Sequence, residues 1–303
     1  MAGPADPPKV AQREKVALVL GAGGARGLAQ IGVIEVLDAR GFEIVAIAGS
    51  SSGALVGGVH AAGKLAEFRE GMERLSRGAF LRMLDPVLGR PGLISGNKLV
   101  DAMREVVGDP DIESLPIAFT AVAVDLERQR VVWLRRGPLW DALRASFAIP
   151  GLFTPHVVHG RELVDGGLLA PLPIAATRMS DAHRLLAVDM HARPRSPPGE
   201  PANGRPQPPE PPGPGPRRGT RLTRWFDRSL GNDPREPGFA EVMSRALDTM
   251  QAQIARVELA LDPPELVIEI PRDVCQFYEF WRAKEAIEAG RVEAEKALAA
   301  AGY

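Results

Sequence analysis

The chain has 303 residues, of which 45% are hydrophobic and 25% are charged, and its formal net charge is −1 at pH 7. This is the composition of an ordinary globular protein, and the near-zero net charge excludes a general electrostatic attraction to nucleic acid. Cys275 is the only cysteine, which excludes an intrachain disulfide and a cysteine-rich zinc site and is in keeping with a reducing compartment.

The N-terminal segment lacks the features of a secretory signal. Its first 15 residues are polar and contain prolines, without an apolar core segment. No later stretch approaches the roughly 18 apolar residues that a spanning helix needs. We therefore expect a cytoplasmic protein that is at most peripherally attached to a membrane. Residues 1–14 are expected to be a disordered tail and residues 15–303 to form a single domain.

A glycine-rich loop follows the first predicted strand. Residues 16–20 are a short buried strand, the loop Gly-Ala-Gly-Gly-Ala-Arg-Gly occupies 21–27, and a helix follows that Gly41 ends. Such a loop presents consecutive backbone N–H groups to an anion. A dinucleotide fingerprint would need glycine where Arg26 stands, and a phosphate-binding loop would need Gly-Lys-Ser/Thr. Neither type of nucleotide site is therefore expected.

The second predicted strand leads into a possible nucleophile. Residues 44–48 are apolar, and Gly49-Ser50-Ser51-Ser52-Gly53 follows them at the start of a helix. This is the context of a nucleophile elbow, in which a sharp turn strains Ser51 and the flanking glycines lack the Cβ atoms that would collide as strand and helix pack. The alternative is a glycine-rich turn whose serines cap a helix.

The two loops are expected to lie side by side. In a parallel sheet, neighbouring strands bring their C-terminal ends together, and active sites form there. The backbone N–H groups of Gly23, Gly24 and Ala25 are then candidates for an oxyanion hole opposite Ser51. Arg26 would fasten the loop or face an anionic head group.

A base is needed to activate the serine. Asp165 ends a predicted strand before Gly166 and Gly167, and this placement makes it the best candidate, although an aspartate before two glycines is also common in turns. The five histidines are His60, His156, His159, His183 and His191. His191, which follows the predicted strand 185–189, is the one credible alternative as a triad histidine.

The middle of the chain is less regular. Residues 79–95 mix apolar residues with two prolines and two glycines, so they cannot form one regular element. We expect either a wall or lid of an acyl-chain pocket, or a looped part of the core. Ser95 is predicted to cap a helix that runs to Val107. Residues 117–124 and 130–134 are predicted strands joined by a turn.

The last third begins with an insertion. Residues 194–216 contain 11 prolines and are expected to be extended or disordered. Residues 217–230 combine five arginines with apolar residues on one helical face. They are expected either to contact an anionic membrane peripherally or to pack on the domain by the apolar side.

The chain then returns to regular structure. A helix over 239–261, a strand over 266–270 and a helix over 277–301 are predicted, with no chemical role for any of them. The aromatic residues among 277–281 are expected to pack in the core rather than to form a ligand cage.

Four blocks carry a family resemblance. GAGGARG, GSSSG, ASFAIPGLFTP and DGG occur in this order, and over roughly residues 15–190 the chain resembles the bacterial patatin-like phospholipases. The resemblance implies a three-layer α/β/α sandwich around a mostly parallel sheet and a Ser–Asp dyad without histidine. It makes Ser51 the nucleophile and Asp165 the base. The other residues that it implicates are Gly23, Gly24 and Ala25 as the oxyanion hole, and Gly49, Gly53, Arg26, Gly27, Gly166 and Gly167 as motif residues.

The chain departs from the usual family pattern at two places. Ala22 stands where many members have another glycine, and Ser50 and Ser52 flank the nucleophile where other residues are common. Neither departure removes a catalytic group, and both leave the substrate preference open.

The expected function is a serine acyl hydrolase that cleaves fatty-acyl esters of phospholipids or lysophospholipids through an acyl-enzyme, without a cofactor or metal. A general carboxylesterase, a thioesterase or an acyltransferase would use the same dyad, and a non-catalytic lipid-binding module is a second alternative. No nucleic acid or nucleotide is expected as a partner. A carboxylate base with an ordinary pKa near 4 predicts a shallow acidic limb in the pH–rate profile.

Overall fold

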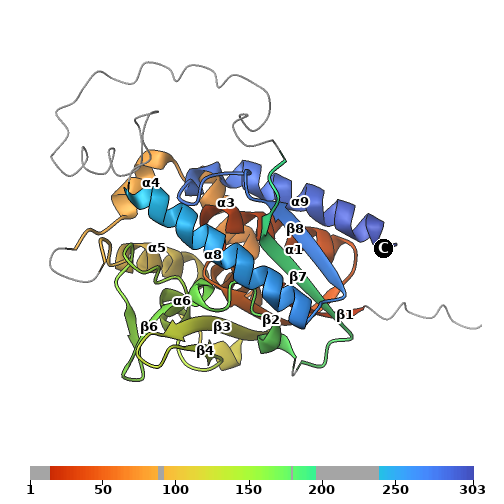
Figure 1. Ribbon diagram of the computed structural model, residues 1–303, viewed down its shortest axis with the longest axis horizontal. Coiled ribbons are helices and arrows are strands. Elements are labelled where there is room, and N and C mark those ends of the chain that lie inside the picture. The colour runs from red at the N-terminus through yellow and green to blue at the C-terminus, as the bar shows by residue number, and fades with distance from the viewer. Residues whose placement is uncertain (1–13, 88–91, 179, 196–238) are drawn as a thin grey trace, which may run out of the picture.

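The computed structural model describes residues 14–87, 92–178, 180–195 and 239–303 (Figure 1). The predicted N-terminal tail up to residue 13, most of the proline-rich insertion and the whole basic segment 217–230 lie outside the described residues. Within the part that is described, no helix combines the length and the apolar character needed to cross a bilayer.

Eight strands form one mixed sheet. Its parallel part has the order β3-β2-β1-β7-β8, and three antiparallel strands extend it on the β3 side. Of the parallel strands, β1, β2, β3 and β7 are buried on both faces over most of their length, as their continuous apolar runs predict, whereas the edge strand β8 is partly exposed. Their bounds are β1 Lys15–Leu20, β2 Glu43–Ser50, β3 Ala118–Asp125, β7 Arg184–Ala192 and β8 Leu266–Pro271; the antiparallel strands are β4 Arg130–Leu134, β5 His156–Val158 and β6 Arg161–Asp165.

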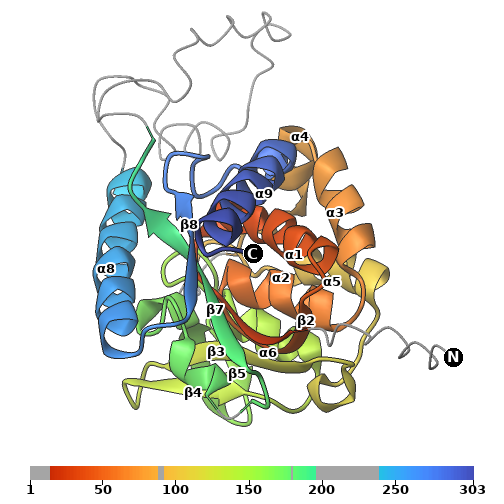
Figure 2. The same ribbon diagram turned by 90° about the vertical axis from the view of Figure 1, so that its right-hand side faces the viewer.

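Helices cover both faces of the sheet, so that the fold has three layers (Figure 2). One face is covered by α1 Ala29–Ala39, α2 Ser52–Ala61, α3 Leu65–Arg74, α5 Asn97–Val107, α6 Leu139–Ser146 and α9 Ala283–Ala300, with the short α4 Arg77–Met83 at one end. The other face carries α8 Phe239–Leu261. This architecture confirms the expected α/β/α sandwich.

Three predicted boundaries are corrected. The strand predicted over 185–189 continues to Ala192, so His191 lies within β7 rather than after it. The predicted C-terminal helix begins only at Ala283, after a 3-10 turn at Phe280–Arg282. Ser95 is not the N-cap of α5: that position is Gly96, in the left-handed region with φ 75°.

Asp85, ten residues upstream, provides the principal cap of α5. Its carboxylate accepts from the Gly96 amide at 2.7 Å and from the Asn97 amide at 3.0 Å, and the Ser95 hydroxyl donates to it. A carboxylate placed at a helix N-terminus is favoured by the exposed amides and the helix dipole. The segment 84–95 is therefore fastened at both of its ends.

The C-terminal helix α9 packs against α1 through two glycines. A Cβ on Gly32 would lie 2.0 Å from the Ile287 carbonyl oxygen, and a Cβ on Gly290 would lie 1.8 Å from the Ala29 carbonyl oxygen. These distances leave no room for any side chain, so the backbones of the two helices are in direct contact. The last helix of the chain is thereby fixed to the helix that follows the glycine-rich loop.

The close contact between α1 and α9 predicts that a side chain at Gly290 lowers the stability of the fold. Gly290→Ala forces α9 away from α1 and should lower the free energy of unfolding by about 1–3 kcal/mol, as is usual for overpacking. Gly71→Ala is the matched control, because a Cβ there meets nothing within 4 Å and α3 gains helix propensity. Urea unfolding followed by circular dichroism measures both, and equal midpoints for the two variants would contradict the prediction.

Candidate active site

The glycine-rich loop and the serine turn lie at the same edge of the sheet. β1 and β2 pair in parallel with Leu20 opposite Gly49, so the segments that follow these residues leave the sheet side by side. A Cβ on Gly53 would lie 2.1 Å from the Leu20 carbonyl oxygen, and one on Gly27 would lie 2.3 Å from the Ser52 Cβ atom. The two segments therefore pack so closely that only glycine fits at the contacts.

Ser51 has the backbone of a nucleophile elbow. Its φ of 57° and ψ of −123° are rare for a residue with a side chain and cost on the order of 1–3 kcal/mol. A Cβ on Gly49 would lie 2.5 Å from the Ala54 amide nitrogen, which explains that glycine. The Ser51 amide donates to the Ser146 hydroxyl at 3.0 Å, and that hydroxyl donates to the Val122 carbonyl at 2.6 Å. Ser146 thus ties the strained turn to β3.

β3 brings Asp165 next to this turn. Along β3, β2 pairs with residues up to Val122, where Ser50 is opposite, and β6 pairs from Ala123, where Asp165 is opposite. Since β4 occupies the other edge at residues 121–125, β2 and β6 share one edge of β3 end to end. The register therefore places the end of β2 and the end of β6 at adjacent positions.

The two glycines after Asp165 are required by close contacts. A Cβ on Gly166 would lie 2.2 Å from the Val122 carbonyl oxygen, and one on Gly167 would lie 2.8 Å from the Ala22 Cβ atom. The Gly167 amide donates to Oδ1 of Asp165 at 2.7 Å. The turn therefore fixes one carboxylate oxygen and leaves the other for a different partner.

The Asp165 carboxyl has an unusual environment. It is 3% exposed, and Oδ2 is buried without a hydrogen-bond partner among the described residues. Burial raises the pKa of this carboxyl to about 7, while the Ser51 hydroxyl and the Gly167 amide lower it to a lesser extent. Ser51 is thus close enough to act on Asp165, although no hydrogen bond of ordinary geometry joins the two side chains. The expectation of an ordinary carboxylate pKa near 4 is wrong because the group is fully desolvated.

The glycine-rich loop differs in part from the predicted oxyanion hole. The Gly23 amide donates to the Ser52 hydroxyl at 3.1 Å, and the Ala25 amide donates to the Phe277 carbonyl at 2.8 Å. Both amides are therefore occupied within the protein, and in this conformation neither is available to an oxyanion. Gly24, in the left-handed region with φ 57°, has an amide that donates to no described residue.

Arg26 fastens this loop to α8. Its guanidinium is 3% exposed and forms two hydrogen bonds with the Asp248 carboxylate, at 2.9 and 2.5 Å. It also donates to the Gly23 carbonyl at 3.4 Å and to the Arg272 carbonyl at 3.3 Å. The prediction that Arg26 ties the loop down agrees with these contacts, and α8 supplies the partner, Asp248. No sequence signal identifies Asp248, because 222 residues separate it from Arg26.

His191 belongs to the same cluster. Its Nδ1 lies 3.9 Å from the Asp248 carboxylate, and its Nε2 is buried without a partner among the described residues. Burial first, and the positive charge of Arg26 second, lower the pKa of His191 to about 4. The structure therefore gives His191 a place beside the ion pair rather than that of a triad histidine beside Ser51.

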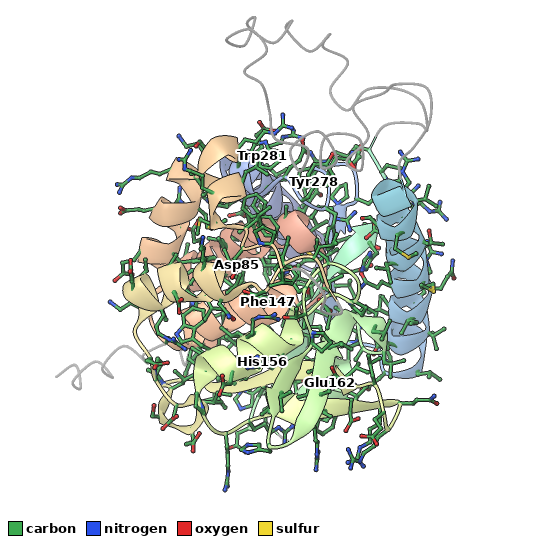
Figure 3. The ribbon with its side chains drawn as sticks, turned by 90° about the vertical axis from the view of Figure 1, so that its left-hand side faces the viewer. Asp85, Phe147, His156, Glu162, Tyr278 and Trp281 are labelled. Atoms are coloured by element: carbon green, nitrogen blue, oxygen red, sulfur yellow. The ribbon has the colours of Figure 1, made fainter. Side chains whose placement is uncertain are left out.

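The aromatic segment 277–281 packs over the glycine-rich loop. A Cβ on Gly24 would lie 2.4 Å from a ring atom of Phe277, and Phe280 stacks on Phe80 of α4 with ring centroids 5.2 Å apart. Trp281 also lies against Phe80, at 6.0 Å. Figure 3 shows Tyr278 and Trp281 on the side of the molecule that also displays Asp85 and Phe147. These aromatic residues are half-buried, so the expected core packing is met only in part.

The segment 84–95 is joined to the end of α6. Arg144, which is 3% exposed, donates to the Ser95 carbonyl at 3.0 Å and to the Thr154 carbonyl at 2.8 Å. Its guanidinium lies 5.6 Å from the ring centroids of both Phe147 and Phe153. Burial lowers the pKa of Arg144 to about 10, so it remains a cation at neutral pH. These contacts fix Ser95, at the end of the segment 79–95, to α6; whether the segment is a wall or lid of an acyl-chain pocket or a looped part of the core stays a prediction.

Ser51 and Asp165 are both buried in this conformation. Ser51 is 4% exposed and Asp165 is 3% exposed. Two surface hollows of about 90 and 100 Å³ lie elsewhere: one borders β7 and residues 177–185, and the other borders β4, α6 and β5. Neither hollow is lined by Ser51 or Asp165.

Comparisons with known proteins show to which family the chain belongs. Residues 18–178 match the family model described as patatin-like phospholipase. An uncharacterized NTE family protein of Mycobacterium tuberculosis is 40% identical over 336 aligned positions, which cover 94% of this chain and 92% of that protein.

Other matches cover a smaller part of the two proteins or have a lower sequence identity. Lysophospholipase nte1 of Emericella nidulans is 31% identical over 183 positions, which are 58% of this chain and 12% of that protein. Among solved structures, VipD from Legionella pneumophila matches 95% of this chain and 67% of its own with 12% identity and a TM-score of 0.45. The family match and the mycobacterial relative decide the assignment: this chain belongs to the patatin-like phospholipase family, a family of lipid acyl hydrolases.

Proposed function

We propose that the chain is a serine acyl hydrolase that cleaves fatty-acyl esters of phospholipids or lysophospholipids, with Ser51 as nucleophile and Asp165 as base. One observation carries the proposal: the strained Ser51 and the buried Asp165 carboxyl meet at adjacent positions of β3. The printed name of a relative, lysophospholipase nte1, supports the lysophospholipid part.

The reaction begins with proton transfer inside the dyad. The Ser51 hydroxyl attacks the ester carbonyl carbon while its proton passes to Oδ2 of Asp165, the oxygen that the Gly167 amide leaves free. The tetrahedral intermediate expels the alcohol, which takes the proton from Asp165, and an acyl-Ser51 ester remains. Water, deprotonated by the same carboxylate, then hydrolyses that ester and regenerates Ser51.

The oxyanion is assigned to amides that the fold leaves unused. In α2 the first intrahelical bond runs from the Leu55 amide to the Ser51 carbonyl at 3.0 Å, so the preceding amides are those at a helix N-terminus. The amide after the nucleophile is a common oxyanion donor. We assign Ser52 and Gly24 as the donors and exclude Gly23 and Ala25, whose amides are bonded within the protein.

Two further expectations stay proposals. A carboxylesterase, a thioesterase and an acyltransferase would form the same acyl-enzyme, and only their acyl donors and acceptors differ. Peripheral contact with an anionic membrane through 217–230 concerns residues outside the described part of the chain.

Covalent labelling tests the dyad. A fluorophosphonate should add once to the wild type, not at all to Ser51→Ala, and at least about a hundredfold more slowly to Asp165→Asn, because an amide cannot accept the serine proton. Intact-protein mass spectrometry reads the adduct. Ser50→Ala is the matched control, since its hydroxyl donates to the Ala170 carbonyl and should leave labelling intact. An adduct that persists in Ser51→Ala would refute the assignment.

The raised pKa of Asp165 makes a pH prediction. The base must be ionised, and its pKa is about 7, so kcat/KM should fall about tenfold per pH unit below pH 7. A histidine base would give a similar limb, but the pKa of His191 is about 4. The limb should therefore persist in His191→Asn. A profile that is flat from pH 5 to 8 would show that the carboxyl is not the titrating base.

The ion pair of Arg26 with Asp248 predicts that Asp248 positions the glycine-rich loop and thereby affects kcat. Asp248→Asn leaves the buried guanidinium without a counter-charge and loosens the loop that holds Gly24, so kcat should fall about 10- to 100-fold with KM for a short ester nearly unchanged. Asp262→Asn is the control, because it breaks an aspartate–arginine pair with Arg178 near the other end of α8. Equal kcat values for the two variants would make the ion pair merely structural.

A further inference from the structure

The Ser52 hydroxyl joins the serine turn to the glycine-rich loop. This buried side chain accepts from the Gly23 amide at 3.1 Å, across 29 positions of the sequence. The loop approaches it at a second position, because a Cβ on Gly27 would lie 2.2 Å from the same hydroxyl oxygen. The residue directly after the nucleophile is therefore in close contact with the loop through its side chain.

The backbone of Gly23 is held at both of its polar groups. Its amide donates to Ser52, and its carbonyl accepts from the Arg26 guanidinium at 3.4 Å. That carbonyl belongs to the same planar peptide group as the Gly24 amide, so the two point in opposite directions. The bonds at Gly23 therefore determine where the Gly24 amide points.

Gly24 is the exception among residues 21–25 of the loop. Its amide donates to no described residue, whereas each of the other amides in this stretch has an acceptor. The acceptors are the Val188 carbonyl for Gly21, the Pro171 carbonyl for Ala22, the Ser52 hydroxyl for Gly23 and the Phe277 carbonyl for Ala25. Hydrogen bonds thus immobilise the loop on both sides of Gly24 and leave its own amide for another acceptor.

Ser52 is connected to both donors of the assigned oxyanion hole. Its own amide, at the N-terminus of α2, is one donor, and its side chain holds the loop that carries the other donor, Gly24. Two donors serve one oxyanion only when both lie about 2.7–3.1 Å from it. The relative position of the two amides is therefore set by a hydrogen bond that Ser52 itself makes.

We propose that the Ser52 hydroxyl is a positioning group for the acyl-transfer reaction, which holds the Gly24 amide beside the Ser52 amide through its bond to Gly23. The inference rests on the proposed function, because it requires the oxyanion that forms when Ser51 attacks an ester. The hydroxyl itself takes no proton and does not contact the ester. Its effect reaches the reacting atoms through the backbone of the loop.

Steady-state kinetics of Ser52→Ala test the proposal. The variant keeps the amide at position 52 and loses the bond to Gly23, so kcat for a water-soluble short-chain ester should fall about tenfold, with KM within about twofold of wild type. Ser50→Ala is the matched control. This neighbouring serine is also buried, but its hydroxyl donates to the Ala170 carbonyl at 2.6 Å and not to the loop, so kcat should stay within about twofold.

A trifluoromethyl ketone separates positioning from damage to the fold. Addition of Ser51 to the ketone gives a hemiketal whose oxyanion occupies the assigned hole. Its dissociation constant should therefore rise in Ser52→Ala by the same factor by which kcat/KM falls. Partial unfolding would instead reduce the number of active sites and leave the dissociation constant of the folded fraction unchanged. The acidic limb of the pH profile, which depends on Asp165, should keep its midpoint.

Two outcomes would overturn the positioning role. An unchanged kcat in Ser52→Ala would show that the hydroxyl does not place the donors. A higher kcat would show that it withholds the Gly23 amide from the oxyanion. Fluorophosphonate labelling distinguishes both from failure of the proposed function: an unlabelled wild type would refute the dyad and the oxyanion with it, whereas a labelled wild type with unchanged Ser52→Ala kinetics would refute the positioning role alone.

Discussion

The candidate site depends on how two strands share one edge of β3. β2 hydrogen-bonds to β3 in parallel as far as Val122, and β6 continues the same edge in the antiparallel sense from Ala123. Two strands that run toward each other in this way must end face to face. Ser51 follows one end and Asp165 is the other, so the backbone pairing of the sheet, rather than any side-chain contact, brings them together. The glycines around both residues let the chain turn where the strands meet.

The burial of Asp165 and the backbone conformation of Ser51 both lower the stability of the fold. Asp165 is fully desolvated and its pKa is about 7, so its ionised form, which the proposed reaction needs, is disfavoured by several kcal/mol relative to a carboxylate in water. The positive φ of Ser51 adds a further cost. Both costs fall on the residues assigned to catalysis, and the buried hydrogen bonds through Ser146 hold the strained turn in place. Such local conflicts are expected where function rather than folding selects the residue.

Local sequence patterns were sufficient for most of the fold. Apolar runs located the strands, and glycines beside Ser51 and Asp165 marked turns in which close packing excludes side chains. Contacts between segments that lie far apart in the sequence are not marked by any local sequence pattern. In the glycine-rich loop, the Gly23 amide donates to the Ser52 hydroxyl and the Ala25 amide donates to the Phe277 carbonyl. These pairings depend on the folded conformation of the loop and have no local sequence pattern. Asp248 likewise lies in a helix whose pattern indicates nothing beyond amphipathicity.

The contacts of the glycine-rich loop also determine when, during synthesis of the chain, the loop can take its final conformation. Its Ala25 amide and its Arg26 side chain are held by residues 277 and 248, which leave the ribosome long after the strands that carry the serine and the aspartate. A nascent chain that has emerged only as far as residue 195 contains every motif residue yet lacks both acceptors. The loop can therefore take the conformation described here only after residue 277 has been synthesised.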